Sequence, residues 1–185
     1  MSLFDLTATE ALDGMAAGDF SALEYAEALA RHTEKMGHIN ALINFDPSPF
    51  LASAKAADER RRKGNAPPLG GLPFVVKDNI DVVGFATTAN TPVLANHRPK
   101  TQGPVIQALA DAGAIVMAKA NLHELAMGPG IGRPPDGEAV VYGAFGPALN
   151  PHDPTVTAGG SSSGTGAAIA ARLAPVGLGT DTGGS

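Results

Sequence analysis

Two glycine-framed serine clusters enclose one short apolar segment near the end of the sequence, at residues 158–166 and 179–185. Glycine permits backbone conformations and close approaches that a side chain would block. The alanine-rich stretch 165–173 predicts a helix whose start is packed with serines, and 174–179 predicts a short buried strand. The unpaired N–H groups at a helix start suit an anion or a developing oxyanion, and the strand would bring the second cluster to the same edge.

Strands alternate with helices along the rest of the sequence, which indicates an α/β fold with a layered sheet. Capping-box spacings at 7–10 and 21–24 predict two N-terminal helices. Further strands are predicted at 41–45, 72–77 and 114–118, and further helices at 50–63, 101–113 and 121–127. We therefore expect a helical scaffold region at 1–65 and a catalytic core region at 66–185, with a Gly- and Pro-rich surface loop at 128–154.

The composition is that of a globular protein with a core, because 44% of the 185 residues are hydrophobic and 17% are charged. The net charge of -5 argues against a nucleic-acid-binding face, and the one basic cluster, 60–63, ends a predicted helix, where cations favour the helix dipole. Cysteine is absent, so any covalent chemistry must use serine, threonine or lysine. No export signal or apolar stretch of about 18 residues occurs, so we expect a cytoplasmic protein without a membrane segment.

The first serine cluster admits other interpretations. The motif G-x-S-x-G at 160–164, centred on Ser162, would indicate a Ser-His-Asp hydrolase, but that fold places its histidine after the serine and all five histidines precede it. A phosphate-binding loop would need a lysine directly after its last glycine. A non-catalytic anion-binding module stays open. The pair His123–Glu124 does not complete a zinc-protease motif and predicts a helix surface.

Serine chemistry without a histidine needs another base, and Lys77 ends the apolar strand 72–77. The pKa of a lysine in water is about 10.4, but burial makes the neutral amine available near neutrality. The alternative is a strand-end lysine that reaches water or pairs with Asp78 or Asp81. These residues by themselves leave both interpretations open.

Five blocks then stand out in order, at 72–81, 121–128, 150–153, 159–165 and 179–185. Together they resemble the amidase signature family from about Thr7 to Ser185. The resemblance implies an α/β/α fold layered around a mixed sheet, of which this chain holds the N-terminal part of a single domain. Family members continue beyond their nucleophile, so we expect the 185 residues alone to be inactive.

The resemblance also implies the catalytic residues. It assigns Lys77 as the base, Ser161 as the serine that follows a cis peptide bond, and Ser185 as the nucleophile. Lys77 would draw a proton through Ser161 while Ser185 attacks the amide, and water would then cleave the acyl-enzyme without any metal or organic cofactor. Backbone N–H groups would form the oxyanion hole, at Thr182, Gly183, Gly184 and Ser185. Ser162 and Asp181 would hold this loop.

The function implied is hydrolysis of a small carboxamide to the acid and ammonia, and 167–179 resembles members acting on arylacetamides. An alternative is the glutaminase subunit of a transfer-RNA-dependent amidotransferase, the one case in which partner subunits and nucleic acid are expected. The expected partner is otherwise a small-molecule amide, with a homodimer as one option. The stretch 130–142 looks like an insertion between the family's blocks.

Overall fold

A four-stranded mixed sheet lies at the centre of the computed structural model, which describes residues 2–127 and 143–185. The strand order is β1-β3-β2-β6, with β2 parallel to both β3 and β6 and with β1 antiparallel to β3. The strands are β1 (Leu42–Ile43), β2 (Pro73–Lys77), β3 (Ile115–Ala120) and β6 (Val176–Leu178). Because β2 is paired on both sides, its carboxyl end is held inside the fold.

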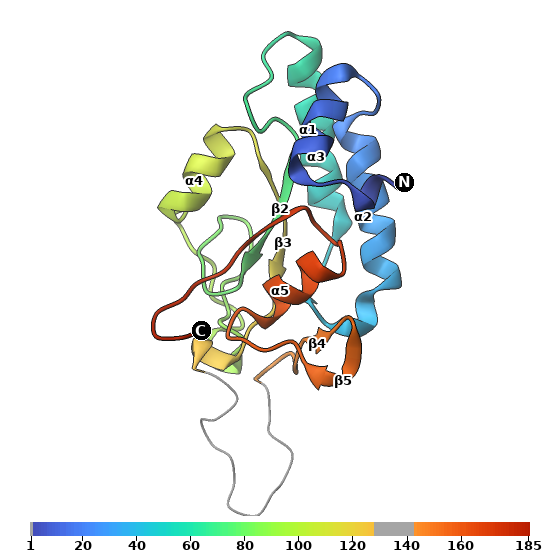
Figure 1. Ribbon diagram of the computed structural model, residues 1–185. Helices are drawn as coiled ribbons and strands as arrows, with labels where there is room; N and C mark the ends of the chain where they lie inside the picture. Colours follow the sequence, from blue (N-terminus) through green and yellow to red (C-terminus); the bar gives the residue numbers. More distant parts are fainter. Residues whose placement is uncertain (1, 128–142) are drawn as a thin grey trace, which may run out of the picture.

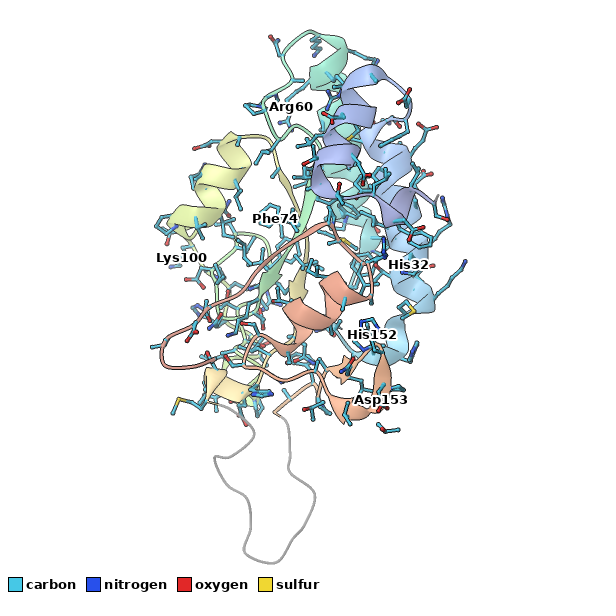
Figure 2. The ribbon with its side chains drawn as sticks, in the orientation of Figure 1. His32, Arg60, Phe74, Lys100, His152 and Asp153 are labelled. Carbon is cyan, nitrogen blue, oxygen red and sulfur yellow. The ribbon has the colours of Figure 1, made fainter. Side chains whose placement is uncertain are left out.

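Strand β2 is buried along its whole length, as its continuous apolar run predicts for a parallel strand covered on both faces. Successive side chains point to opposite faces of a sheet. Val75 accordingly packs in the core cluster with the N-terminal helices, whereas Phe74 and Val76 pack in a second cluster with Ile106. Figure 2 shows Phe74 on the side of the sheet that faces α4.

Helices cover both faces of the sheet, which confirms the layered α/β/α fold (Figure 1). One face carries α5 and, beside it, the N-terminal helices, while α4 lies on the other face through Ile106. The helices are α1 (Ala8–Ala17), α2 (Ala22–Lys35), α3 (Pro47–Arg62), α4 (Pro104–Asp111) and α5 (Ser163–Ala170). Within the described residues, no helix combines the length and the apolar character needed to cross a bilayer.

The two predicted capping boxes are present. The Thr7 hydroxyl accepts the Glu10 N–H at 3.3 Å, and the Glu10 carboxylate accepts the Thr7 N–H at 2.8 Å, with the same exchange between Ser21 and Glu24. Helix α3 begins at Pro47, three residues earlier than predicted, because Asp46 caps it. Its basic last turn ends at the surface, and Figure 2 shows Arg60 at that end of the helix.

The described part of the predicted loop 128–154 is not all irregular. It leads into a hairpin of β4 (Leu149–Asn150) and β5 (Asp153–Thr157). The β-branched run Thr155–Thr157 favours a strand, a signal that the surrounding glycines and prolines obscure. The predicted helix 121–127 is only a 3-10 helix, Glu124–Ala126. The suspected insertion 130–142 lies outside the described residues.

Gly164 gives a test of how closely α5 packs on the sheet. A Cβ at this position would lie 2.4 Å from the Ala41 carbonyl oxygen and 2.4 Å from the Asn121 nitrogen, both of them backbone atoms. We expect Gly164→Ala in the full-length protein to lower the free energy of unfolding by about 1–3 kcal/mol, the usual range for overpacking. Denaturant unfolding measures it.

Gly166 is the matched control, because it lies on the same helix and a Cβ there would meet nothing within 4 Å. Gly166→Ala should be neutral or should stabilise by up to about 1 kcal/mol, because alanine is the better helix former. Equal destabilisation by the two substitutions would contradict the close packing at Gly164.

Candidate active site

Lys77 and Ser161 meet at the carboxyl end of β2. Lys77 is fully buried, and its Nζ lies 2.6 Å from Ser161 Oγ. The same nitrogen lies 3.2 Å from the Thr180 carbonyl oxygen and 2.8 Å from Thr180 Oγ1. Because Val76 is in register with Leu178, the parallel strands β2 and β6 end side by side and deliver these residues to one edge.

Ser161 follows a cis peptide bond from Gly160, at the position where the resemblance places one. The Ser161 side chain is buried, and the backbone carbonyl oxygen of Ser161 accepts the backbone N–H of His123 at 3.0 Å. The His123 ring packs against Gly160, where a Cβ would lie 2.3 Å from Cε1 of the ring. The prediction that His123 lies on a helix surface is therefore wrong: only 8% of it is exposed, because the chain turns inward to bind Ser161.

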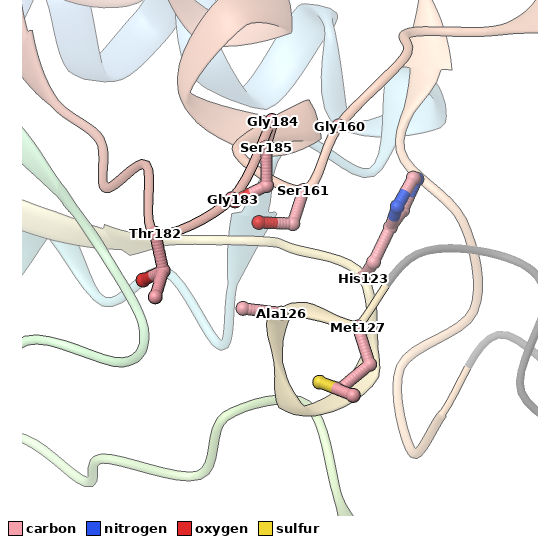
Figure 3. Close-up of a pocket in the computed structure, with 9 residues that line it drawn as sticks. All are labelled: His123, Ala126, Met127, Gly160, Ser161, Thr182, Gly183, Gly184 and Ser185. Atoms are coloured by element: carbon pink, nitrogen blue, oxygen red, sulfur yellow. The ribbon is translucent and has the colours of Figure 1, made fainter.

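Ser185 shares a pocket with Ser161, His123 and the last glycines (Figure 3). Its Oγ donates to the Thr180 carbonyl oxygen at 3.4 Å rather than to Ser161. The structure thus brings all three predicted catalytic residues to one place, with Ser185 Oγ turned to a backbone oxygen. The pocket residues are His123, Ala126, Met127, Gly160, Ser161, Thr182, Gly183, Gly184 and Ser185.

Asp181 and Ser162 both form hydrogen bonds with the loop that they are predicted to hold. Asp181 Oδ1 accepts the N–H groups of Gly184 at 2.8 Å and Ser185 at 3.0 Å. Ser162 Oγ lies 3.3 Å from both the nitrogen and the carbonyl oxygen of Thr180. Two of the four predicted oxyanion-hole donors are therefore bonded to a carboxylate in this conformation, and the oxyanion hole stays a prediction.

The electrostatics favour a neutral amine. Burial lowers the pKa of Lys77, and the charge of Asp181 opposes that shift. The pKa of Asp181 is in turn lowered by the Ser185 and Gly184 N–H groups. Burial also lowers the pKa of His123, which favours the neutral form of its imidazole. A lysine held in this way is suited to accept a proton.

Comparison with known proteins identifies the family. A family model described as Amidase matches residues 24–185. The chain belongs to the amidase family. The resemblance carried by the five sequence blocks is thereby confirmed.

Relatives within the amidase family have several different names. The chain is 43% identical over 185 residues to a glutamyl-tRNA(Gln) amidotransferase subunit of Chloroflexus aurantiacus, covering 99% of this chain and 36% of the relative. It is 42% identical over 187 residues to a mandelamide hydrolase of Pseudomonas putida, with the same coverage. The structure of a peptide amidase from Stenotrophomonas maltophilia matches with a TM-score of 0.79 at 30% identity, covering 92% of this chain and 35% of that one. The chain thus spans about a third of the length of these relatives.

A buried ion pair beside Lys77 was not predicted from the sequence. Lys119 Nζ lies 2.7 Å from Asp78 Oδ1, and both side chains are almost fully buried. Lys119 also donates to the Ile80 carbonyl oxygen at 2.9 Å, and Thr88 donates to Asp78 through its hydroxyl and its N–H. Asp78 therefore pairs with Lys119 and not with Lys77, which excludes the alternative of an ion pair between Lys77 and Asp78. The sequence did contain a signal for this ion pair, because Lys119 lies inside the apolar run that forms β3.

The described residues contain no group of three or more histidine and carboxylate side chains placed to hold a metal ion.

The pH dependence of stability tests whether Lys77 is buried as an amine. Its pKa is lower in the folded protein, so the unfolded chain binds more protons between the two pKa values and the free energy of unfolding rises with pH there. We expect full-length wild type to gain stability over Lys77→Met as the pH is raised from 7 toward 10, measured by denaturant unfolding.

Replacement of the exposed Lys100 by methionine is the control. Its stability difference from wild type should not change over the same range. A constant difference for Lys77→Met as well would show that the Lys77 amine has the same pKa in the folded and unfolded states.

Proposed function

We propose that the whole protein is an amidase that hydrolyses a small carboxamide to the carboxylic acid and ammonia. The observation that carries this proposal is the 2.6 Å contact between the buried Lys77 Nζ and Ser161 Oγ, beside a pocket that also contains Ser185. A buried amine bonded to a serine hydroxyl is a general base with its proton donor already in place. The proposal is made for the full-length protein, because this chain spans about a third of the length of its relatives.

The proposed reaction begins with proton transfer. Neutral Lys77 accepts the Ser161 hydroxyl proton, Ser161 takes the proton of Ser185, and Ser185 Oγ attacks the amide carbon. For this, Ser185 Oγ turns from the Thr180 carbonyl oxygen to Ser161. The proton returns through Ser161 to the leaving nitrogen, ammonia departs, and water hydrolyses the acyl-enzyme by the same relay.

The proposed oxyanion hole lies in the loop 182–185. The N–H groups of Gly184 and Ser185 bond Asp181 Oδ1, so an oxyanion formed at Ser185 shares or replaces that contact. In enzymes that use such donors, removing one lowers kcat by about a hundredfold to a thousandfold. Before the oxyanion forms, Asp181 holds the loop in its turned conformation through these two bonds. This is the supporting role proposed for Asp181.

The pocket favours an uncharged substrate. Its volume is about 460 Å³, within the usual range for small-molecule sites. Apart from His123, its described lining carries hydroxyls, glycines and the apolar side chains of Ala126 and Met127. An arylacetamide fits this lining, and the similarity to a mandelamide hydrolase supports the same substrate class.

A second candidate is the glutaminase subunit of an amidotransferase, because of the 43% identity to the amidotransferase subunit of Chloroflexus aurantiacus. Glutamine carries two charged groups, and among the described lining residues no charged side chain is available to bind them. We therefore rank it second. The non-catalytic anion-binding module ranks third. A cytoplasmic location and a homodimer stay predictions.

Substitution of the nucleophile tests the catalytic assignment. We expect Ser185→Ala in the full-length protein to abolish ammonia release and labelling by a fluorophosphonate probe, because no other hydroxyl would attack the amide. Ser162→Ala is the matched control, since Ser162 bonds the same loop but is not in the relay. Activity that survives Ser185→Ala and is lost in Ser162→Ala would favour the Ser-His-Asp interpretation instead.

A substrate panel separates the candidate functions. Ammonia release is measured on arylacetamides, aliphatic amides and glutamine, the last with and without amidotransferase partner subunits and charged transfer RNA. We expect turnover of uncharged amides without any partner. Glutamine turnover that appears only with the partner and transfer RNA would establish the second candidate, and no turnover or probe labelling at all would favour the binding module.

A further inference from the structure

Thr180 binds the Lys77 amine through two different atoms. Lys77 Nζ lies 3.2 Å from the Thr180 carbonyl oxygen and 2.8 Å from Thr180 Oγ1, and its third contact is Ser161 Oγ at 2.6 Å. Three oxygens therefore surround the nitrogen, one for each hydrogen of a charged ammonium. Two of the three come from one residue, so Thr180 sets how the amine is oriented.

The neutral amine has two hydrogens and one lone pair to place among the same three oxygens. The Thr180 carbonyl accepts only, so it takes one N–H. The other N–H and the lone pair are divided between the hydroxyls of Thr180 and Ser161. When Thr180 Oγ1 takes the N–H, the lone pair faces Ser161 and accepts its proton. In the opposite arrangement the amine donates to Ser161, and proton transfer is blocked.

Asn79 makes a second contact with the same hydroxyl. Its Nδ2 donates to Thr180 Oγ1 at 3.0 Å. Asn79 lies in the turn that directly follows β2, where the Ile80 N–H donates to the Lys77 carbonyl oxygen at 3.0 Å. The amide and the amine therefore belong to one short segment and contact the Thr180 hydroxyl together.

We propose that Thr180, held by Asn79, is a positioning residue that directs the lone pair of neutral Lys77 at Ser161. This proposal rests on the proposed function of Lys77 as the base. Thr180 does not line the described pocket, so it acts through Lys77 and not on the substrate.

The test is the pH dependence of kcat and KM in full-length Thr180→Val, on an amide that the wild type hydrolyses. We expect kcat to fall about tenfold or more, a part of the usual contribution of a general base, with KM unchanged. The acid limb of the kcat profile should move to lower pH, because an acceptor that stabilises the ammonium is lost and the pKa of Lys77 falls further. Thr180→Ser keeps the hydroxyl and should restore both kcat and the acid limb.

Thr165→Val is the matched control. Thr165 Oγ1 donates to the Leu178 carbonyl oxygen at 3.3 Å, next to the same strand, but does not contact Lys77. Loss of this hydroxyl should leave kcat and the acid limb as in wild type. If Thr180→Val does not fold, Thr180→Ala removes the hydroxyl without adding a methyl group, and the same profile is measured.

Three outcomes would overturn the positioning role. One is a wild-type kcat and acid limb in the variant that lacks the hydroxyl, and another is a serine variant as impaired as the valine one. The third is a fall in kcat without any movement of the acid limb. Lys77→Ala, measured alongside, separates this proposal from the one it rests on: an active Lys77→Ala would remove the proposed base itself, whereas an inactive one confines the failure to Thr180.

Discussion

A lysine amine buried at the end of a parallel strand is the constraint on which the rest of the site depends. Burial disfavours the charged form of Lys77, and three oxygen atoms from Ser161 and Thr180 compensate for the lost water. The same environment that destabilises the ammonium makes the amine a base. The apolar strand β2, paired on both sides, holds the backbone of Lys77 inside the fold.

The oxygens around Lys77 reach it because parallel strands end at the same edge. Strand β6 lies beside β2 with Leu178 in register with Val76. Thr180, which comes just after Leu178, therefore lies at the same edge of the sheet as Lys77. A second buried lysine, Lys119, holds the turn after β2 through Asp78. Removing one partner of such a buried pair is strongly destabilising, because the other charge is left uncompensated. The pair therefore stabilises the turn after β2, which carries Asn79.

Close backbone packing places Ser161. The His123 ring occupies the space that a side chain at Gly160 would need, and Gly164 lies against the backbone of Ala41 and Asn121. Both glycines therefore serve close approach, and neither has a positive φ. The serine cluster is a tightly packed connection between the sheet and α5 instead of a flexible turn.

The amino-acid sequence by itself determined the alternation of strands and helices, the capped N-terminal helices and the membership of the amidase family, because periodicity, capping residues and motif order are local properties of a chain. It also pointed to Lys77, Ser161 and Ser185, although their roles stay predictions. Only the tertiary structure decided that His123 is buried against Gly160, that Asp78 pairs with Lys119, and that Thr180 holds the amine. Each of these contacts joins residues distant in the sequence, and their pairing depends on strand register and on which face of the sheet each side chain enters, which no local pattern specifies.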